Sequence, residues 1–102
     1  MIHVIATITL NPNTRAAFLE VFGWVTPLVR AEDGCIEYQA TVDVQTTIAV
    51  QDTVRQDVVI VVEKWATLEA LYAHTKAPHM TEYRTKVKDY VTGVKLQVTE
   101  PV

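Results

Sequence analysis

The strongest strand signal in the sequence is the run Val58-Val59-Ile60-Val61-Val62. β-Branched side chains favour the extended, pleated backbone of a strand. The run is apolar at every position, so both faces of this strand are apolar, and that predicts burial on both sides. The strand therefore belongs to a sheet that is covered on both faces.

Upstream of this run, the hydrophobic pattern predicts two strands with a helix between them. Residues 2–10 and 36–42 alternate apolar and polar side chains with the period of a strand. In residues 18–29, apolar side chains recur at helical spacing. Pro27 lies inside this pattern, so we expect one kinked helix rather than two. Gly34 is expected to end the helix, because glycine readily adopts the positive φ of a C-terminal cap.

Downstream, the pattern predicts two helices and a last strand. The mostly polar residues 44–57 first form a loop or an extended hairpin. A short helix is expected over residues 68–75, and a second one starts at Pro78 and ends at Gly93. Residues 94–98 then alternate as a strand.

The order of these elements is β-α-β-β-α-β, which is the split βαβ arrangement of a ferredoxin-like α+β fold. We expect one domain over residues 1–102, with helices on one face of a four-stranded antiparallel sheet. The other face carries the second apolar side of the run at 58–62. Because a large exposed apolar sheet is unusual on a monomer, we expect a second copy to cover it in a homodimer.

Composition excludes several classes of function. The chain has nine Lys and Arg against twelve Asp and Glu, with a net charge of −3, so no nucleic-acid partner is expected. No apolar run is long enough to span a bilayer, so no membrane partner is expected. The single cysteine, Cys35, and the absence of a signal-peptide pattern predict a cytoplasmic protein.

Three glycines are too few for a Gly-rich phosphate or dinucleotide loop. His74 and His79 flank Pro78, and their spacing is not the i, i+4 pairing of a helical metal site, so no metal site is expected.

Two segments resemble the antibiotic biosynthesis monooxygenase family, and most of all its short bacterial quinol monooxygenases. They are GCIEYQATVD at 34–43 and VVIVVEKWATLEALYAHTKAPHM at 58–80, and the likeness extends over essentially the whole chain. Its distinctive parts are Glu-Asp-Gly-Cys at 32–35, Glu63-x-Trp65, and His74 with Pro78-His79. The resemblance implies a dimeric α/β barrel built from ferredoxin-like domains.

The resemblance also implies an oxygenase without a cofactor, acting on a small quinol or phenolic aromatic with dioxygen. A deprotonated quinol is an electron-rich anion that can itself donate an electron to dioxygen. The protein then has to supply an apolar pocket, a proton acceptor and groups that position the ring. Histidine suits the acceptor role because its unperturbed pKa lies near 6.5. His74 and His79 are therefore the catalytic candidates.

Five further side chains are candidates for substrate binding. Trp65 ends a buried strand and can form a pocket wall. Tyr72 and Tyr83 carry hydroxyls for a substrate oxygen, and Arg84 can attract an anion. Glu63 either orients a histidine or pairs across the sheet. Packing also explains Trp65, Tyr72 and Tyr83, and a solvated position on the helix is favoured for Arg84.

Other activities occur on the same scaffold, so the alternatives need separate tests. Its haem-degrading enzymes use Asn, Trp and His where this chain has Ala6, His74 and Arg84, so haem degradation is not expected. A non-oxidative role stays open, as a small-molecule binding protein or as an isomerase of a small phosphorylated carbonyl compound. The lack of an evident phosphate cradle weighs against the isomerase.

Overall fold

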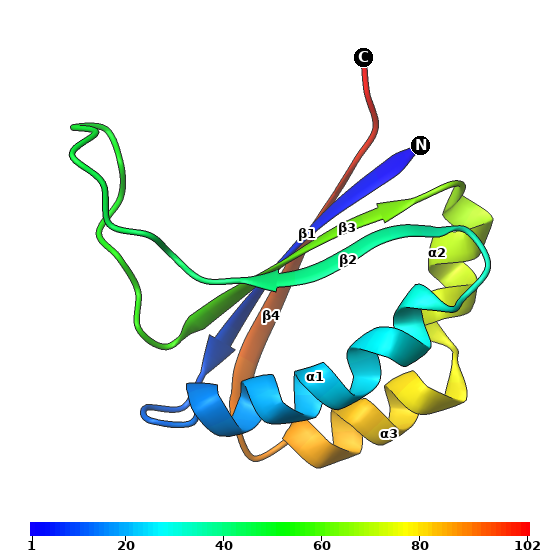
Figure 1. The fold of residues 1–102 in the computed structure, drawn as a ribbon, viewed down its shortest axis with the longest axis horizontal. Helices are drawn as coiled ribbons and strands as arrows, with labels where there is room; N and C mark the ends of the chain where they lie inside the picture. Colours follow the sequence, from blue (N-terminus) through cyan, green and yellow to red (C-terminus); the bar gives the residue numbers. More distant parts are fainter.

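The computed structural model describes residues 1–102 and has four strands and three helices (Figure 1). In chain order they are β1 (Ile2–Leu10), α1 (Arg15–Arg30), β2 (Cys35–Thr41), β3 (Val58–Trp65), α2 (Leu68–Thr75), α3 (Pro78–Val87) and β4 (Val91–Thr99). The strands form one antiparallel sheet in the order β2-β3-β1-β4. The predicted ferredoxin-like α+β fold is confirmed.

The core lies between the sheet and the helices, which gather on one face of it (Figure 1). Alternate side chains of β1 and β3 point into this layer, because the side-chain period of a strand is two. The apolar stripe of α1 meets them with Phe18, Phe22, Val25 and Val29, all buried. The helical period predicted for this segment is confirmed.

The helix layer does not cover the whole sheet. α1 packs on β2 and α3, and α2 packs on β3, which leaves the inner face of β4 open. There Val94, Leu96 and Val98 are 56%, 58% and 48% exposed, although they pair with Ile8, Ala6 and Val4 in the core-facing row of β1. The open side of the molecule therefore lies along β4.

The opposite face of the sheet has an apolar centre. Ile5 pairs with Val62 and Thr7 with Ile60, and all four side chains are half-buried in a single chain. We call Ile5, Ile60 and Val62 the outer apolar patch. The predicted second apolar side of β3 is present, but no element of the chain covers it.

Gly34 and Gly93 do not end helices, in contrast to the prediction. α1 is one continuous helix with Pro27 inside it, as expected, but it ends at Arg30, before Gly34. Gly34, with φ +80°, forms the turn into β2 instead. α3 ends at Val87, and Gly93 lies within β4, because sheet pairing with β1 takes over this segment from Val91.

The strand β2 also differs in detail from the predicted alternation. Its register against β3 shifts between Cys35 and Glu37, and Ile36 at the shift is 52% exposed. Past this bulge the alternation is as predicted, with Tyr38 buried on the helix side.

Residues 42–57 form the predicted loop, which projects from the body of the sheet (Figure 1). Its base is closed by Asp43, which accepts hydrogen bonds from the backbone and the guanidinium of Arg55. These bonds lower the pKa of Asp43 to about 2.

None of the helices has the length and apolar character needed to cross a membrane.

Candidate active site

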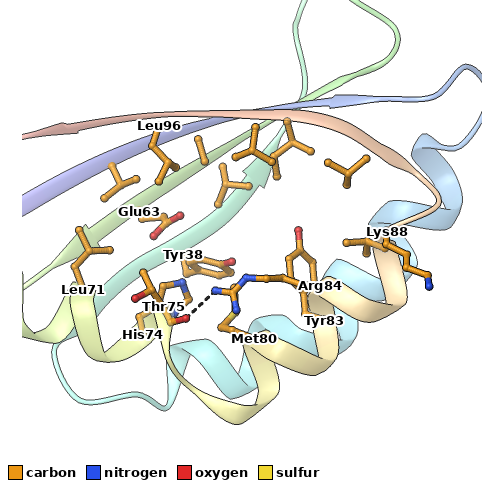
Figure 2. Close-up of a pocket in the computed structure, with 17 residues that line it drawn as sticks. Tyr38, Glu63, Leu71, His74, Thr75, Met80, Tyr83, Arg84, Lys88 and Leu96 are labelled. Atoms are coloured by element: carbon orange, nitrogen blue, oxygen red, sulfur yellow. Dashed lines mark hydrogen bonds between the residues drawn. The ribbon is translucent and has the colours of Figure 1, made fainter.

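An apolar cavity of about 520 Å³ lies between the open part of the sheet and the helices α2 and α3 (Figure 2). Twelve of its 17 lining residues are hydrophobic. The strands contribute its roof, chiefly Val4, Ala6, Ile8, Val61 and Leu96. The volume and lining suit a small, largely apolar molecule.

His74 is the buried imidazole of this cavity. It sits in the last turn of α2 and lines the cavity wall. Its ring packs on Trp65, with centroids 4.7 Å apart, and edge-on to Tyr38 at 5.5 Å. Because Nδ1 bonds to Glu32, Nε2 is the nitrogen left without a partner in the chain.

Glu32 reaches His74 because of the turn between α1 and β2. The backbone N–H of Glu32 bonds to Val29 O, and the N–H of Cys35 bonds to Glu32 O, which closes the turn. At its apex, Gly34 lies so close to α2 that an added Cβ would be 2.6 Å from Ala70 Cβ. The close approach of the turn to α2 places the Glu32 carboxylate beside His74.

The same carboxylate joins both predicted histidines. Glu32 Oε2 lies 3.0 Å from Nδ1 of His74 and 2.6 Å from Nε2 of His79, and Oε1 lies 3.2 Å from Nδ1 of His74. His79, at the start of α3, is not among the residues that line the cavity. The three side chains form a row that runs from the cavity wall outward.

Glu63 is a second carboxyl group inside the cavity. It is only 6% exposed, and its Oε1 accepts a hydrogen bond of 2.9 Å from Nε1 of Trp65. Burial raises the pKa of Glu63, while the Trp65 hydrogen bond and the nearby His74 oppose that shift. Its carboxyl group points into the cavity in Figure 2.

Polar groups from α3 and the end of α2 complete the wall. The hydroxyl of Tyr83 points toward the roof, and burial raises the pKa of Tyr83 above its ordinary value (Figure 2). Arg84 donates a hydrogen bond of 2.8 Å to the backbone O of Thr75, the last residue of α2. Lys88 adds a second cation to the lining.

The structure brings four of the seven predicted site residues to the cavity: His74, Glu63, Tyr83 and Arg84. The other three, His79, Trp65 and Tyr72, do not line it. Trp65 is fully buried behind Glu63 and His74, and Tyr72 is 55% exposed on α2.

Sequence reasoning did not single out Glu32 as a site residue. The signal was present, since Glu32 opens the Glu-Asp-Gly-Cys segment at 32–35 that carries part of the family resemblance. A carboxylate in a turn after a helix has no periodicity that marks it as a partner of a distant histidine.

No group of three or more His, Cys, Asp and Glu side chains is arranged to hold a metal ion. In the row of Glu32, His74 and His79, the carboxylate oxygen itself occupies the space between the two ring nitrogens.

Fold and site together define a ferredoxin-like α+β domain with an apolar cavity of small-molecule size and a carboxylate-bonded histidine in its wall. The family model for antibiotic biosynthesis monooxygenases matches residues 1–86. The chain therefore belongs to the antibiotic biosynthesis monooxygenase family, as the resemblance predicted.

Individual relatives agree with this assignment. The chain is 32% identical to the probable quinol monooxygenase YgiN of Escherichia coli K12, over 99% of this chain and 98% of that protein. The crystal structure of PA3566 from Pseudomonas aeruginosa is similar in fold, with a TM-score of 0.80 at 22% identity, over 99% of this chain and 93% of that one. Rv0793 from Mycobacterium tuberculosis has a TM-score of 0.76 at 25% identity, over 99% and 94% of the two chains. The family and the similarity to YgiN support a monooxygenase activity.

Proposed function

We propose that this protein is a cofactor-independent monooxygenase that oxidises a small quinol or phenolic aromatic with dioxygen in the cavity beside His74. The observation that carries the proposal is the buried His74. Its Nδ1 is bonded to a carboxylate, and its ring lines an apolar cavity of about 520 Å³. The similarity to YgiN supports the quinol class of substrate.

The chemistry starts with proton transfer. His74 takes the hydroxyl proton of the bound quinol at Nε2, which leaves an electron-rich anion in an apolar surrounding. The anion donates an electron to dioxygen, and the resulting pair combines at the ring. For a 1,4-hydroquinone the balance is one quinol and one dioxygen giving one hydroxyquinone and one water, so the quinol supplies all the electrons.

Other lining groups have supporting roles in this proposal. The Tyr83 hydroxyl faces the cavity and can bond a substrate oxygen. Glu63 is a second proton acceptor on the opposite wall, and Trp65 fixes its carboxyl group by donating the indole N–H. The apolar roof holds the ring.

The decisive experiment measures oxygen uptake with a panel of 1,4-benzo- and naphthohydroquinones, corrected for uncatalysed autoxidation. With ¹⁸O₂, we expect one labelled oxygen in the hydroxyquinone product. His74→Gln is expected to lower kcat by about 100-fold or more, since a general base contributes about 10²–10⁴-fold.

The matched control is His3→Gln, the same change on the opposite face of the sheet, and it is expected to keep activity. Uptake that ends in hydrogen peroxide and unlabelled quinone contradicts a monooxygenase. No uptake above the uncatalysed rate with any quinol contradicts the proposal as a whole.

A second candidate rests on the two cations of the cavity wall, Arg84 and Lys88. They favour an anionic ligand, as in a binding protein or an isomerase of a small phosphorylated carbonyl compound. Thermal stabilisation by sugar phosphates and not by quinols supports this second candidate, because a ligand that binds the folded state raises its stability.

The proposal includes a homodimer, joined through the outer apolar patch. Ile5, Ile60 and Val62 are adjacent on one face, with Gln39 and Gln97 as the polar neighbours of the Ile5–Val62 pair in the flanking strands. An apolar centre with a polar rim is the usual make-up of an interface between copies.

A cytoplasmic location also belongs to the proposal and rests on the single cysteine.

A further inference from the structure

Glu32 is the charged group in contact with His74, yet it does not line the cavity. Its side chain is 14% exposed, that of His74 is 6% exposed and that of His79 is 21% exposed. The carboxylate therefore lies behind the imidazole, on the side away from a bound molecule. Any part it has in a reaction must act through His74.

The hydrogen bonds determine where the protons sit. An ionised carboxylate has only acceptors, so each ring nitrogen that contacts Glu32 must donate. His74 then carries its proton on Nδ1, and in the neutral ring Nε2 holds the free lone pair. Because Nδ1 donates to Glu32, the lone pair is on Nε2, the nitrogen of His74 that has no partner in the chain.

We propose that Glu32 is the positioning residue of this site: it keeps His74 in the tautomer whose Nε2 accepts the substrate proton, and His79 holds the Glu32 carboxylate in place. This inference rests on the proposed role of His74 as the acceptor. When Nε2 takes a proton, the ring becomes an imidazolium, and the carboxylate 3.0 Å from Nδ1 stabilises the new charge. No proton needs to leave the His74–Glu32 pair during this step.

His79 has the geometry of a support and not of a base. Its Nε2 lies 2.6 Å from Glu32 Oε2, and it approaches from α3, whereas His74 approaches from α2. Two donors from two helices restrict the carboxylate to one orientation. A side chain that can donate a hydrogen bond to Glu32 without acting as a base should therefore replace His79 well.

The other titratable groups around His74 do not replace Glu32. Glu63 faces the ring from β3, but its bonded oxygen accepts from Trp65, not from the imidazole. Tyr38 packs edge-on from β2, and burial raises its pKa, which keeps it neutral. Cys35, near Glu32 at the start of β2, is also kept protonated, because burial and the two nearby carboxylates raise its pKa.

The first test is ¹⁵N NMR of the histidine side chains in the folded protein, without substrate. We expect the neutral form of His74 to carry its proton on Nδ1 in the wild type and in Glu32→Asp. In Glu32→Gln we expect this preference to be lost. A wild-type His74 protonated on Nε2, or a tautomer that is unchanged in Glu32→Gln, overturns the inference.

The second test measures quinol oxidation. Glu32→Gln should lower kcat by about 100-fold with little change in KM, because the acceptor is misplaced while the cavity is intact. Glu32→Asp should recover part of kcat.

The kcat of His79→Gln, which keeps a donor, should stay within about threefold of wild type, and that of His79→Leu should fall by about tenfold. A loss in His79→Gln equal to that in His74→Gln makes His79 a base and overturns the inference.

The two tests separate this inference from the proposed function. If no quinol is oxidised, the proposed function fails, but the tautomer measurement still decides whether Glu32 orients His74. If Glu32→Gln does not fold, the wild-type spectrum and Glu32→Asp still give the answer.

Discussion

At the residue scale, the site depends on two carboxyl groups, the buried Glu63 and the partly exposed Glu32, with different surroundings. Glu32 has two imidazole donors, whereas Glu63 has one indole donor and an apolar cavity around it. Burial raises the pKa of Glu63 and so opposes its ionisation, while the Trp65 hydrogen bond and the nearby His74 act against that shift. In the proposed mechanism Glu32 stabilises charge on His74, whereas Glu63 is the group that costs stability when it is ionised.

Glu63→Gln should therefore stabilise the protein at neutral pH. The folded-state pKa of Glu63 is raised, so the folded form holds its proton more tightly than the unfolded form does. Stability then falls as pH rises from the unfolded value of about 4.3 through the folded value. The glutamine side chain keeps an oxygen for Trp65 but has no charge. We therefore expect the melting temperature of Glu63→Gln to exceed that of wild type by a few degrees at pH 7.5.

At pH 4 the two proteins should melt at nearly the same temperature, because Glu63 is then largely neutral in both states. The exposed Glu20→Gln serves as the matched control and should show no such pH dependence. A variant less stable than wild type at pH 7.5 contradicts the assigned cost of this carboxylate.

At the element scale, the turn between α1 and β2 is what connects the fold to the site. It carries Glu32 and needs the positive φ of Gly34. Its Gly34 O accepts a hydrogen bond from the N–H of Ala66, in the connection between β3 and α2. The helix α2, which follows β3, carries His74. Packing of this turn on α2 thus sets the distance between carboxylate and imidazole.

Gly34→Ala should lower the free energy of unfolding by about 2 kcal/mol or more, because backbone strain and overpacking act together. The added Cβ would meet Ala70 Cβ at 2.6 Å. In a double-mutant cycle measured by denaturant unfolding, Ala70→Gly should recover about 1 kcal/mol of that loss, since it removes the clash and not the strain.

Ala70→Gly alone provides the reference for the cost of glycine in a helix. Independent, additive effects of the two substitutions would show that the close approach of turn and helix contributes nothing to stability.

At the scale of the whole molecule, the two faces of the sheet are covered differently. The inner face is covered by helices except along β4, where the cavity opens. The outer face has no cover in a single chain, although its centre is apolar. A second copy on the outer face leaves the cavity accessible, because the cavity lies on the other side of the sheet.

Val62→Arg should convert the proposed dimer into a monomer. A buried unpaired charge in the outer apolar patch is costly, whereas it is well solvated in a separate chain. Light scattering should give twice the chain mass of 11.5 kDa for wild type and 11.5 kDa for the variant.

Thr81→Arg, on the exposed face of α3, is the control and should remain dimeric. A wild-type mass of one chain at micromolar concentration contradicts the dimer.

The sequence alone determined the strands, the order of elements and the family, because the side-chain period and the family-specific residues are local properties of the chain. Val58 to Val62 lie in β3, an interior strand of the sheet, four residues of the predicted stripe of α1 are buried (Phe18, Phe22, Val25 and Val29), and His74 lines the cavity. The sheet pairing that ends α3 at Val87 is not local, and that boundary was predicted too late in the chain.

Only the tertiary structure decided which candidates share a site. Glu32 is 42 positions from His74 and 47 from His79, and the contact between them depends on how one turn packs against two helices. The same packing moved Tyr72 to the surface, placed Trp65 behind the cavity wall and left β4 open. Local pattern specifies which residues form an element, whereas the juxtaposition of distant side chains is a property of the assembled core.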